Sequence, residues 1–214
     1  MKNIVIIDYH LGNLFSVIQA FRHLGIEPIV SSSREDIQNA HGLVLPGVGS
    51  FDQAMKNIKE LGIDKIIVEK VRNGCPLFGI CLGLQLLFEV SEEGEQCDGL
   101  GILSGKVIKL DNLKSNNSRI PHMNWAKIKT KELTKSNNSP ININQQDKYF
   151  YFVHSYYVEP EDQNIILTQT KYGNGLFTSS VLIDNVFACQ FHPEKSSEEG
   201  LEIFNNWLNI NKLI

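Results

Sequence analysis

The amino-acid sequence predicts an α/β fold in which a central, mostly parallel sheet is flanked by helices and extended by antiparallel strands. The first half of the 214-residue chain alternates short apolar runs with stretches of helical periodicity, a rhythm typical of parallel sheets covered by helices. The second half changes character between residues 111 and 148, where Asn, Lys and Ser are frequent and apolar runs are few. There we expect short antiparallel strands joined by exposed turns.

The first half of the chain is predicted to form a series of strands, each followed by a helix. The run "NIVIID" predicts a buried strand over 3–8, and the apolar spacing from Leu14 to Leu24 predicts a helix. The next expected elements are a strand over 27–30, a helix capped by Ser33, a strand over 42–49 and helices over 52–61 and 65–71. A fourth strand at 76–80 leads into a helix that starts at Leu82 and extends through Phe88.

Strand patterns return later in the chain, at 148–153, 164–170 and 186–191. A turn is expected at Gly173–Gly175, and a terminal amphipathic helix over 197–208. The Asn-rich segment 136–146 is predicted to be a mobile loop. With this length and no internal repeat, we expect residues 1–214 to form a single domain.

The composition excludes several classes of function. With 20 basic and 24 acidic residues the net charge is −4. The sequence has no stripe of basic residues of the kind that would indicate nucleic-acid binding. The first apolar run is too short for a signal peptide, and no run reaches the length of a membrane span. No C-x-x-C pair and no secretory context occur, which favours a reducing, cytoplasmic setting without disulfides or a metal such as zinc. The four cysteines are Cys75, Cys81, Cys97 and Cys189.

One of these cysteines stands where a strand is expected to turn sharply into a helix. In "PLFGICLGLQLLF" (76–88), Cys81 has Gly79 and Gly83 at minus two and plus two. Glycines at these positions let the backbone pack closely around a strained turn that exposes the central side chain, as in a nucleophile elbow. The turn also places the sulfur at a helix N-terminus, whose dipole favours a thiolate. The alternative is a buried structural cysteine, a common location for this residue.

A cysteine nucleophile needs a base, and the base needs an acceptor that orients it. In "CQFHPEKS" (189–196), His192 follows an apolar strand and Glu194 lies two positions further on. Pro193 between them disfavours helix for His192 and keeps the pair extended. The alternative is a surface His-Pro turn. His154 in "YFVHSYY" also ends a strand, but it has no carboxylate as close in sequence.

Several motifs, in order along the chain, resemble those of the class I glutamine amidotransferases. They are "IIDYHLGNLFSV", "PGVGSF", "FGICLGLQLLFE", "PHMNW", "YFVHSYY" and "QFHPEKS". Together they cover essentially the whole chain and are most similar to the glutaminase subunits of imidazole glycerol phosphate synthases. The resemblance implies the flavodoxin-like fold of that family, glutamine as substrate and no cofactor.

The resemblance also implies a role for each matching residue. Cys81 would attack the side-chain amide of glutamine, His192 would act as base and then as acid for the departing ammonia, and Glu194 would hold His192. Backbone N–H groups of Leu82 and Val48 would stabilise the oxyanion, Val48 after a peptide flip in the "PGVG" loop. The substrate-binding residues would be Gly47, Gly49, Gln85, Glu93, Ser155 and Tyr156.

By the same resemblance, the ammonia would pass to a partner subunit in a heterodimer. That partner would be a (β/α)-barrel synthase that makes imidazole glycerol phosphate and aminoimidazole carboxamide ribotide for histidine and purine metabolism. Asn13, Trp125 and Lys195 would lie at the interface through which ammonia passes.

Two residues depart from the family pattern, and both lie in segments expected to face the partner. His10 and Asn124 stand where glycine is usual. They leave open a second partner, a sugar-modifying amidotransferase of surface-glycan biosynthesis. A DJ-1-like cysteine hydrolase could share the elbow but would not need Gln85, "HSYY" and "HPEKS" together. A catalytically inactive binding subunit is disfavoured, since all three triad residues are present.

Overall fold

The computed structural model describes all residues except 1, 95–96, 116–117, 132–138 and 143–144. Its described residues build a 13-stranded mixed sheet in the order β2-β1-β3-β4-β13-β12-β10-β7-β5-β6, with β11, β8 and β9 branching from β12. The parallel part contains β1 (Ile4–Ile7), β2 (Ile29–Ser31), β3 (Gly42–Leu45), β4 (Leu77–Ile80) and β13 (Val186–Cys189). The α/β prediction is therefore confirmed, with an antiparallel part larger than a few added strands.

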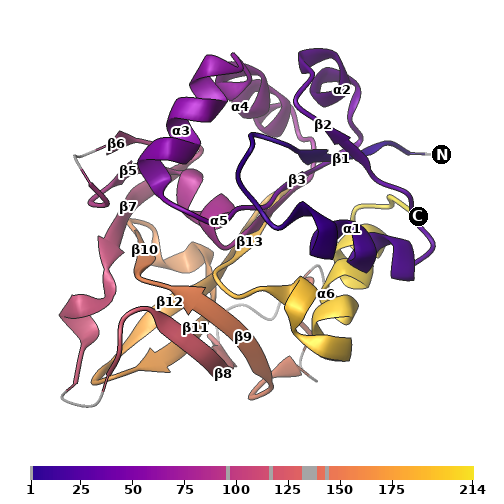
Figure 1. Ribbon diagram of the computed structural model, residues 1–214. Helices are drawn as coiled ribbons and strands as arrows, with labels where there is room; N and C mark the ends of the chain where they lie inside the picture. Colours follow the sequence, from indigo (N-terminus) through magenta and orange to yellow (C-terminus); the bar gives the residue numbers. More distant parts are fainter. Residues whose placement is uncertain (1, 95–96, 116–117, 132–138, 143–144) are drawn as a thin grey trace.

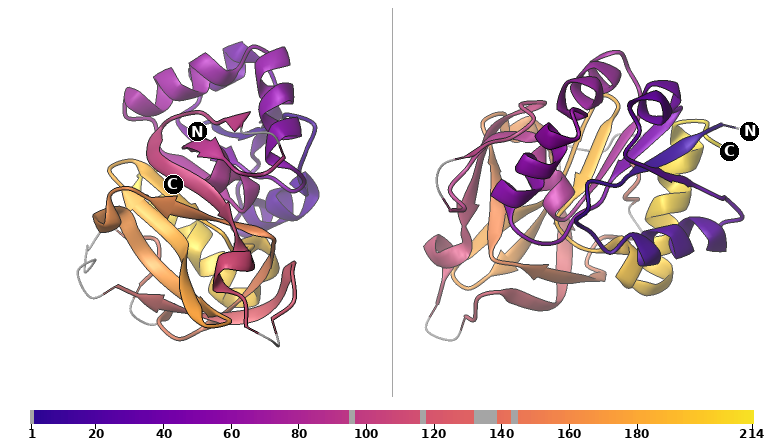
Figure 2. Two further views of the ribbon diagram at one scale, coloured as in Figure 1. Left: turned by 90° about the vertical axis from the view of Figure 1, so that its left-hand side faces the viewer. Right: turned by 45° about the horizontal axis from the view of Figure 1, so that its top comes forward.

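Helices cover both faces of the parallel strands (Figures 1 and 2). One face packs against α2 (Arg34–Asn39), α3 (Phe51–Glu60) and α4 (Asp64–Arg72), and the other against α1 (Leu14–His23) and α6 (Ser197–Ile210). β1 is buried along its whole length because its side chains alternate between these two layers. Val5 and Ile7 join the first core, while Ile4 and Ile6 join the second.

The mostly antiparallel part of the sheet lies on the far side of β13, and within it β5 and β7 pair in parallel. Its strands are β5 (Phe88–Ser91), β6 (Cys97–Asp98), β7 (Leu103–Lys109), β8 (His122–Thr130), β9 (Tyr149–His154), β10 (Tyr156–Pro160), β11 (Ile166–Tyr172) and β12 (Gly175–Ile183). An aromatic cluster fills the space beside these strands: the rings of Phe150 and Phe191 lie 4.5 Å apart, and those of Phe152 and Phe177 lie 5.6 Å apart. Short 3₁₀ turns occupy Leu110–Leu113, Gln163–Ile165 and Pro193–Lys195.

The predicted helix after Cys81 is wrong in its extent. The helix α5 (Leu82–Leu86) has only five residues, and Phe88 begins β5 instead of extending the helical face. All of residues 82–88 are buried: α5 packs against α3, β4 and β5, and Phe88 belongs to the same core cluster. A continuous apolar run of this kind does not distinguish a helix from a strand.

The segment 136–146, predicted as a mobile loop, lies partly outside the described residues. Its described part packs against α6: Ile141 belongs to the core, and Gln145 Nε2 donates to the Glu199 carbonyl at 2.8 Å. Both Ile141 and Gln145 are almost fully buried, so the mobile-loop prediction is wrong for this part. Within the described residues, no helix is both long enough and apolar enough to span a membrane.

Candidate active site

Cys81 lies at the carboxyl end of β4, in the sharp turn that leads into α5. Its backbone has φ 54° and ψ −108°, a strained conformation for a residue with a side chain. A Cβ atom at Gly83 would lie 1.7 Å from the Leu45 carbonyl oxygen, and one at Gly79 would lie 2.9 Å from Ala188 Cβ. The Leu45 backbone therefore leaves no room for a side chain at Gly83, and the Ala188 side chain leaves little room for one at Gly79, as expected for an elbow.

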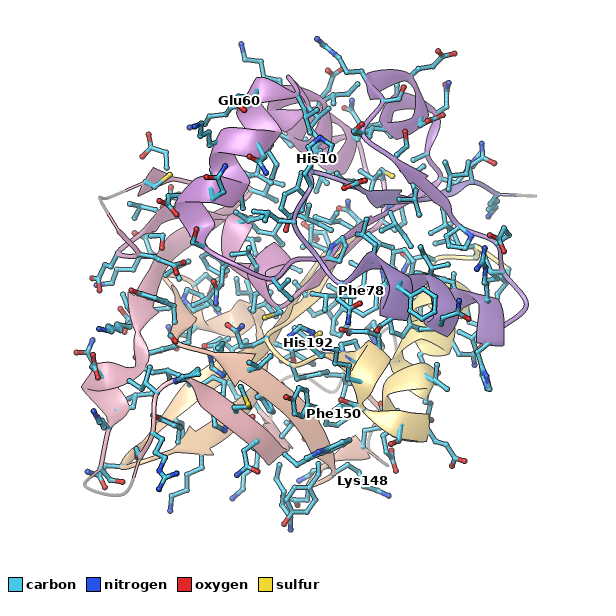
Figure 3. The ribbon with its side chains drawn as sticks, viewed as in Figure 1. His10, Glu60, Phe78, Lys148, Phe150 and His192 are labelled. Carbon is cyan, nitrogen blue, oxygen red and sulfur yellow. The ribbon has the colours of Figure 1, made fainter. Side chains whose placement is uncertain are left out.

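His192 follows β13, the strand that pairs in parallel with β4, so it ends at the same edge of the sheet as Cys81. Its Nδ1 lies 2.8 Å from Glu194 Oε1, and both side chains are 2% exposed. The backbone of His192 is held by hydrogen bonds to the Tyr151 carbonyl and from the Ser196 hydroxyl. Its Nε2 is buried without a hydrogen-bond partner in the described part of the chain, which leaves that nitrogen free for a reacting group. Figure 3 labels His192 near the centre of the view, with Phe150 below it.

The electrostatic surroundings of His192 favour its protonated form. Burial lowers the pKa of His192, but the neighbouring Cys81 sulfur and the Glu194 carboxylate together outweigh burial and raise it to about 10. An imidazole in this state holds the proton that a base takes from a thiol and can pass it to a leaving amine. The geometry therefore provides a nucleophile, a base and an orienting carboxylate.

A cavity of about 240 Å³ opens beside Cys81. Its lining residues come from the "PGVG" loop, the elbow with α5, the Glu93 turn, the residue before β8, and the end of β9 with the start of β10. They are Val48, Gly49, Cys81, Leu82, Gln85, Glu93, Pro121, Val153, His154, Ser155 and Tyr156. A larger cavity of about 490 Å³ lies beside α3 and α4, but it is lined by neither the nucleophile nor the base. The chemistry thus favours the smaller cavity.

Three residues predicted to bind substrate make specific contacts with the protein. Gln85 is not on an exposed helix face: it is 4% exposed, and its Nε2 donates to the Tyr156 carbonyl at 3.0 Å. Glu93 Oε2 accepts a hydrogen bond from the Phe51 backbone at 2.9 Å, and burial is the main cause that raises the pKa of this carboxyl. Gly47 does not line the cavity, because it is packed against the Tyr9 hydroxyl and Leu82.

The three predicted interface residues lie on neighbouring elements. Lys195 is exposed in the 3₁₀ turn after Glu194, and Asn13 caps α1, which contacts that turn. Trp125 on β8 is 44% exposed, and its ring lies 6.0 Å from the ring of Tyr151, which in turn lies 6.4 Å from the ring of His192. Aromatic rings thus lead from the surface at Trp125 toward the buried histidine.

The two departures from the family pattern differ in backbone conformation. His10 has φ 65°, in the left-handed region that favours glycine, and its backbone N–H donates to Asp8 Oδ1 at 2.8 Å. Asn124 does not have a positive φ, and its Oδ1 accepts a hydrogen bond from the Trp125 backbone at 2.8 Å. A glycine's conformational freedom is therefore not needed at Asn124.

Sequence reasoning missed several residues of this site. Pro121, Val153 and His154 line the cavity, and Gln190 approaches the Cys81 sulfur. His154 ends β9 and Gln190 follows β13, both inside the motifs "YFVHSYY" and "QFHPEKS", but those motifs do not show which way the two side chains point. Among the described residues, no group of three or more His, Cys, Asp or Glu side chains is placed to hold a metal ion.

His154 forms a buried pair with His122 behind the cavity. Their nearest ring nitrogens lie 3.1 Å apart, and His154 Nδ1 lies 2.8 Å from the Tyr156 carbonyl oxygen, to which it must donate. Burial lowers the pKa of His122 to about 4. Burial and the neighbouring His122 lower the pKa of His154 to about 3. Both rings are therefore neutral in the folded protein at neutral pH.

This buried pair is expected to make the protein sensitive to mild acid. Below pH 6.5 the two histidines become protonated in the unfolded state but stay neutral in the folded state, because their pKa is lowered there. Protonation therefore stabilises the unfolded state relative to the folded state as the pH falls. Each histidine should lower the free energy of unfolding by up to about 1.4 kcal/mol per pH unit between about pH 6 and pH 4. Urea unfolding at pH 7.5, 6.0 and 5.0 measures this dependence.

A matched variant for this test is His122→Phe, which keeps an aromatic ring beside Phe152, Tyr172 and Phe177. It should unfold with a weaker pH dependence than the wild type, even if it is less stable at pH 7.5. The same pH dependence in both proteins would contradict the assignment.

Comparison with known proteins connects this geometry to a family. The sequence model of the family "Glutamine amidotransferase class-I" matches residues 5–210. The chain is 44% identical to an imidazole glycerol phosphate synthase subunit HisH from a Geobacillus species, covering 96% of this chain and 95% of that protein. It is 46% identical to the subunit of the same name from Aquifex aeolicus, covering 95% of this chain and 94% of that protein.

Solved structures agree with this similarity at the level of the fold. A crystal structure of a glutamine amidotransferase superposes with a TM-score of 0.70 at 21% identity, covering 97% of this chain and 98% of that chain. The structure of PurLQS from Thermotoga maritima gives a TM-score of 0.72 at 19% identity, covering 98% and 99%.

Proposed function

This chain belongs to the class I glutamine amidotransferases, within the group of the imidazole glycerol phosphate synthase subunit HisH, and from that premise we propose how its residues carry out the reaction. We propose that residues 1–214 act as one glutaminase domain that hydrolyses glutamine to glutamate and ammonia for histidine biosynthesis. The observation that carries the proposal is the buried His192–Glu194 pair, 2.8 Å apart, beside the elbow cysteine.

The reaction begins when the Cys81 sulfur attacks the side-chain amide carbon of glutamine. A C–S bond forms, and the carbonyl electrons move to the oxygen, which the backbone N–H groups of Leu82 and Val48 stabilise. His192 gives its proton to the amide nitrogen, the C–N bond breaks, and ammonia leaves a thioester on Cys81. His192 then takes a proton from water, whose oxygen attacks the thioester to give glutamate and restore the thiolate.

The cavity beside Cys81 supports a small amino acid as substrate. Its volume of about 240 Å³ is below the range typical of sites for drug-sized ligands. Glu93 offers a carboxylate to the α-amino group of glutamine, while the backbone at Gly49, Ser155 and Tyr156 offers hydrogen bonds to its polar ends. Gln85 supports this wall by its bond to the Tyr156 carbonyl.

Use of the released ammonia requires a partner that receives it before it becomes ammonium in bulk water. We propose a barrel-type synthase that docks in a heterodimer over Asn13, Trp125 and Lys195 and receives ammonia in the cytoplasm. Exposed apolar side chains support docking there, since Phe15 on α1 is 70% exposed and Met123 on β8 is 60% exposed. Relatives 44–46% identical to this chain are named imidazole glycerol phosphate synthase subunit HisH, which favours the histidine-pathway partner over a surface-glycan partner and over a cysteine hydrolase.

The "PGVG" loop is expected to make glutaminase activity depend on this partner. The Tyr9 hydroxyl donates to the Pro46 carbonyl at 2.7 Å, and a Cβ at Gly47 would lie 2.1 Å from that hydroxyl. The first half of the loop is thus tightly packed, and we propose that the Val48 N–H turns inward only when the synthase docks. Because one oxyanion donor is worth about 10²–10³ in rate, the isolated chain should be slower than the complex by about that factor.

The test measures glutamine hydrolysis by the isolated chain, by the chain with the barrel synthase of the same genome, and by the complex with the synthase ligand bound. An unrelated barrel protein serves as the control and should not stimulate hydrolysis. Full activity of the isolated chain, unchanged by the synthase, would contradict the partner dependence.

A further inference from the structure

A buried glutamine, Gln190, lies against the sulfur of the nucleophile. Gln190 lies directly after β13 and is fully buried. Its backbone N–H donates to the Ser179 carbonyl at 2.9 Å, which fixes the start of its side chain. Its amide group lies between Gln85 and Cys81: Gln190 Oε1 is 3.0 Å from Gln85 Nε2, and Gln190 Nε2 is 3.6 Å from Cys81 Sγ.

The hydrogen-bond network decides which end of the Gln190 amide faces the sulfur. The Tyr156 carbonyl can only accept, so the Gln85 atom that faces it at 3.0 Å must be the nitrogen, Nε2. That nitrogen carries a second hydrogen, which points to Gln190, so the Gln190 atom that meets it must be the oxygen. Gln190 Nε2, a donor, is then left facing Cys81 Sγ. The Tyr156 carbonyl therefore fixes the orientation of the Gln85 amide, which in turn fixes the orientation of the Gln190 amide.

Some groups around the Cys81 sulfur favour its thiol form, and others favour its thiolate form. The Val153 carbonyl oxygen, 3.8 Å from Cys81 Sγ, can accept from a thiol but repels a thiolate. An N–H donor does the opposite, because a hydrogen bond to an ionised acceptor is about twice as strong as one between neutral groups. Gln190 and the protonated His192 are thus the two groups that favour the thiolate.

We propose that Gln190 is a further catalytic residue, whose Nε2–H donates to the Cys81 sulfur and stabilises the thiolate that attacks glutamine. Gln85 is the positioning residue that fixes the direction of this donor from the Tyr156 carbonyl. The same carbonyl belongs to the wall of the substrate cavity, so the nucleophile and that wall are joined by a single chain of hydrogen bonds. The inference rests on the proposed role of Cys81 as nucleophile.

The test is the pH dependence of Cys81 alkylation in the full-length chain. Iodoacetamide reacts with the thiolate, so the rate of Cys81 modification, followed by mass spectrometry of its peptide, reports the apparent pH midpoint of the coupled Cys81–His192 pair. Gln190→Met removes the donor at nearly constant volume. A hydrogen bond to a charged group is worth about one to two pH units, so the midpoint should rise by about that amount. At a pH below both midpoints, alkylation should slow by about ten- to a hundredfold.

Gln145→Met is the matched control, because Gln145 is equally buried but bonds to the Glu199 carbonyl near α6. It should lower the thermal unfolding temperature without moving the alkylation midpoint. If Gln190→Met does not fold, as judged by circular dichroism, Gln190→Leu replaces it. An unchanged midpoint in a folded Gln190 variant would overturn the proposal.

The wild type separates this inference from the proposed function. If alkylation of Cys81 in the wild-type complex leaves glutamine hydrolysis intact, Cys81 is not the nucleophile and the proposed function fails. If alkylation abolishes hydrolysis but the midpoint of the Gln190 variant is unchanged, only the role of Gln190 fails.

Discussion

Replacing Cys81 with alanine is expected to abolish glutamine hydrolysis, with a loss on the order of 10⁴-fold or more, because the nucleophile of a triad has no substitute. The change removes only a sulfur atom from a side chain that is 6% exposed, and alanine tolerates the backbone of the elbow as well as cysteine does. Synthesis from added ammonium salts by the complex with the synthase should survive, since that chemistry belongs to the other chain. The measurement compares product formation from glutamine and from ammonium.

Cys97→Ala is the matched control, because Cys97 is only partly buried and does not line the cavity. It should hydrolyse glutamine at the wild-type rate. In the wild type, a glutamine-like electrophile should label Cys81 and none of the other three cysteines. Substantial hydrolysis by the Cys81→Ala variant would end the proposed mechanism.

Replacing Gly83 with alanine is expected to damage both folding and activity. The added methyl group would lie 1.7 Å from the Leu45 carbonyl oxygen and 2.8 Å from the Leu45 carbonyl carbon. These are backbone atoms of β3, which cannot move aside like the end of a flexible side chain. We expect the free energy of unfolding to fall by about 2–4 kcal/mol and glutaminase activity to be lost, as the elbow shifts away from His192.

Urea unfolding and glutaminase assays of the complex measure the two effects of Gly83→Ala. Gly25→Ala serves as the control, because a Cβ there meets no atom within 4 Å. Its φ of +78° should cost only about 1–2 kcal/mol, with no loss of activity. Wild-type stability and activity in Gly83→Ala would show that the close approach to β3 is not required.

The sequence predicted the parallel part of the fold well, because its strands are buried on both faces and read as short, continuous apolar runs. It did not predict β12, whose centre contains Thr178, Ser179 and Ser180. These side chains are buried, and both serine hydroxyls lie within 2.8 Å of Thr168 Oγ1 on β11, so hydrogen bonds replace apolar contacts. Such a partner, distant in sequence, is not visible in a local hydrophobic pattern.

In the candidate site, too, some residues could be predicted from the sequence and others could not. Cys81, His192 and Glu194 were predicted because each stands in a local motif whose geometry has a chemical meaning. Gln190 was not, because its importance depends on two neighbours, Gln85 and Cys81, that are 105 and 109 residues away in the sequence. Only the folded chain brings these three side chains together.

The position of β13 has a consequence for the order of events during synthesis. This strand is hydrogen-bonded between β4 and β12, in the interior of the sheet, although it is the last strand along the chain. A nascent chain that already contains Cys81 therefore keeps one edge of β4 unpaired until residues 186–189 leave the ribosome. Pairing across such a long separation is slow, and an open strand edge invites association with other chains. The base arrives with the same strand, so the nucleophile has no His192 beside it until this late step closes the sheet.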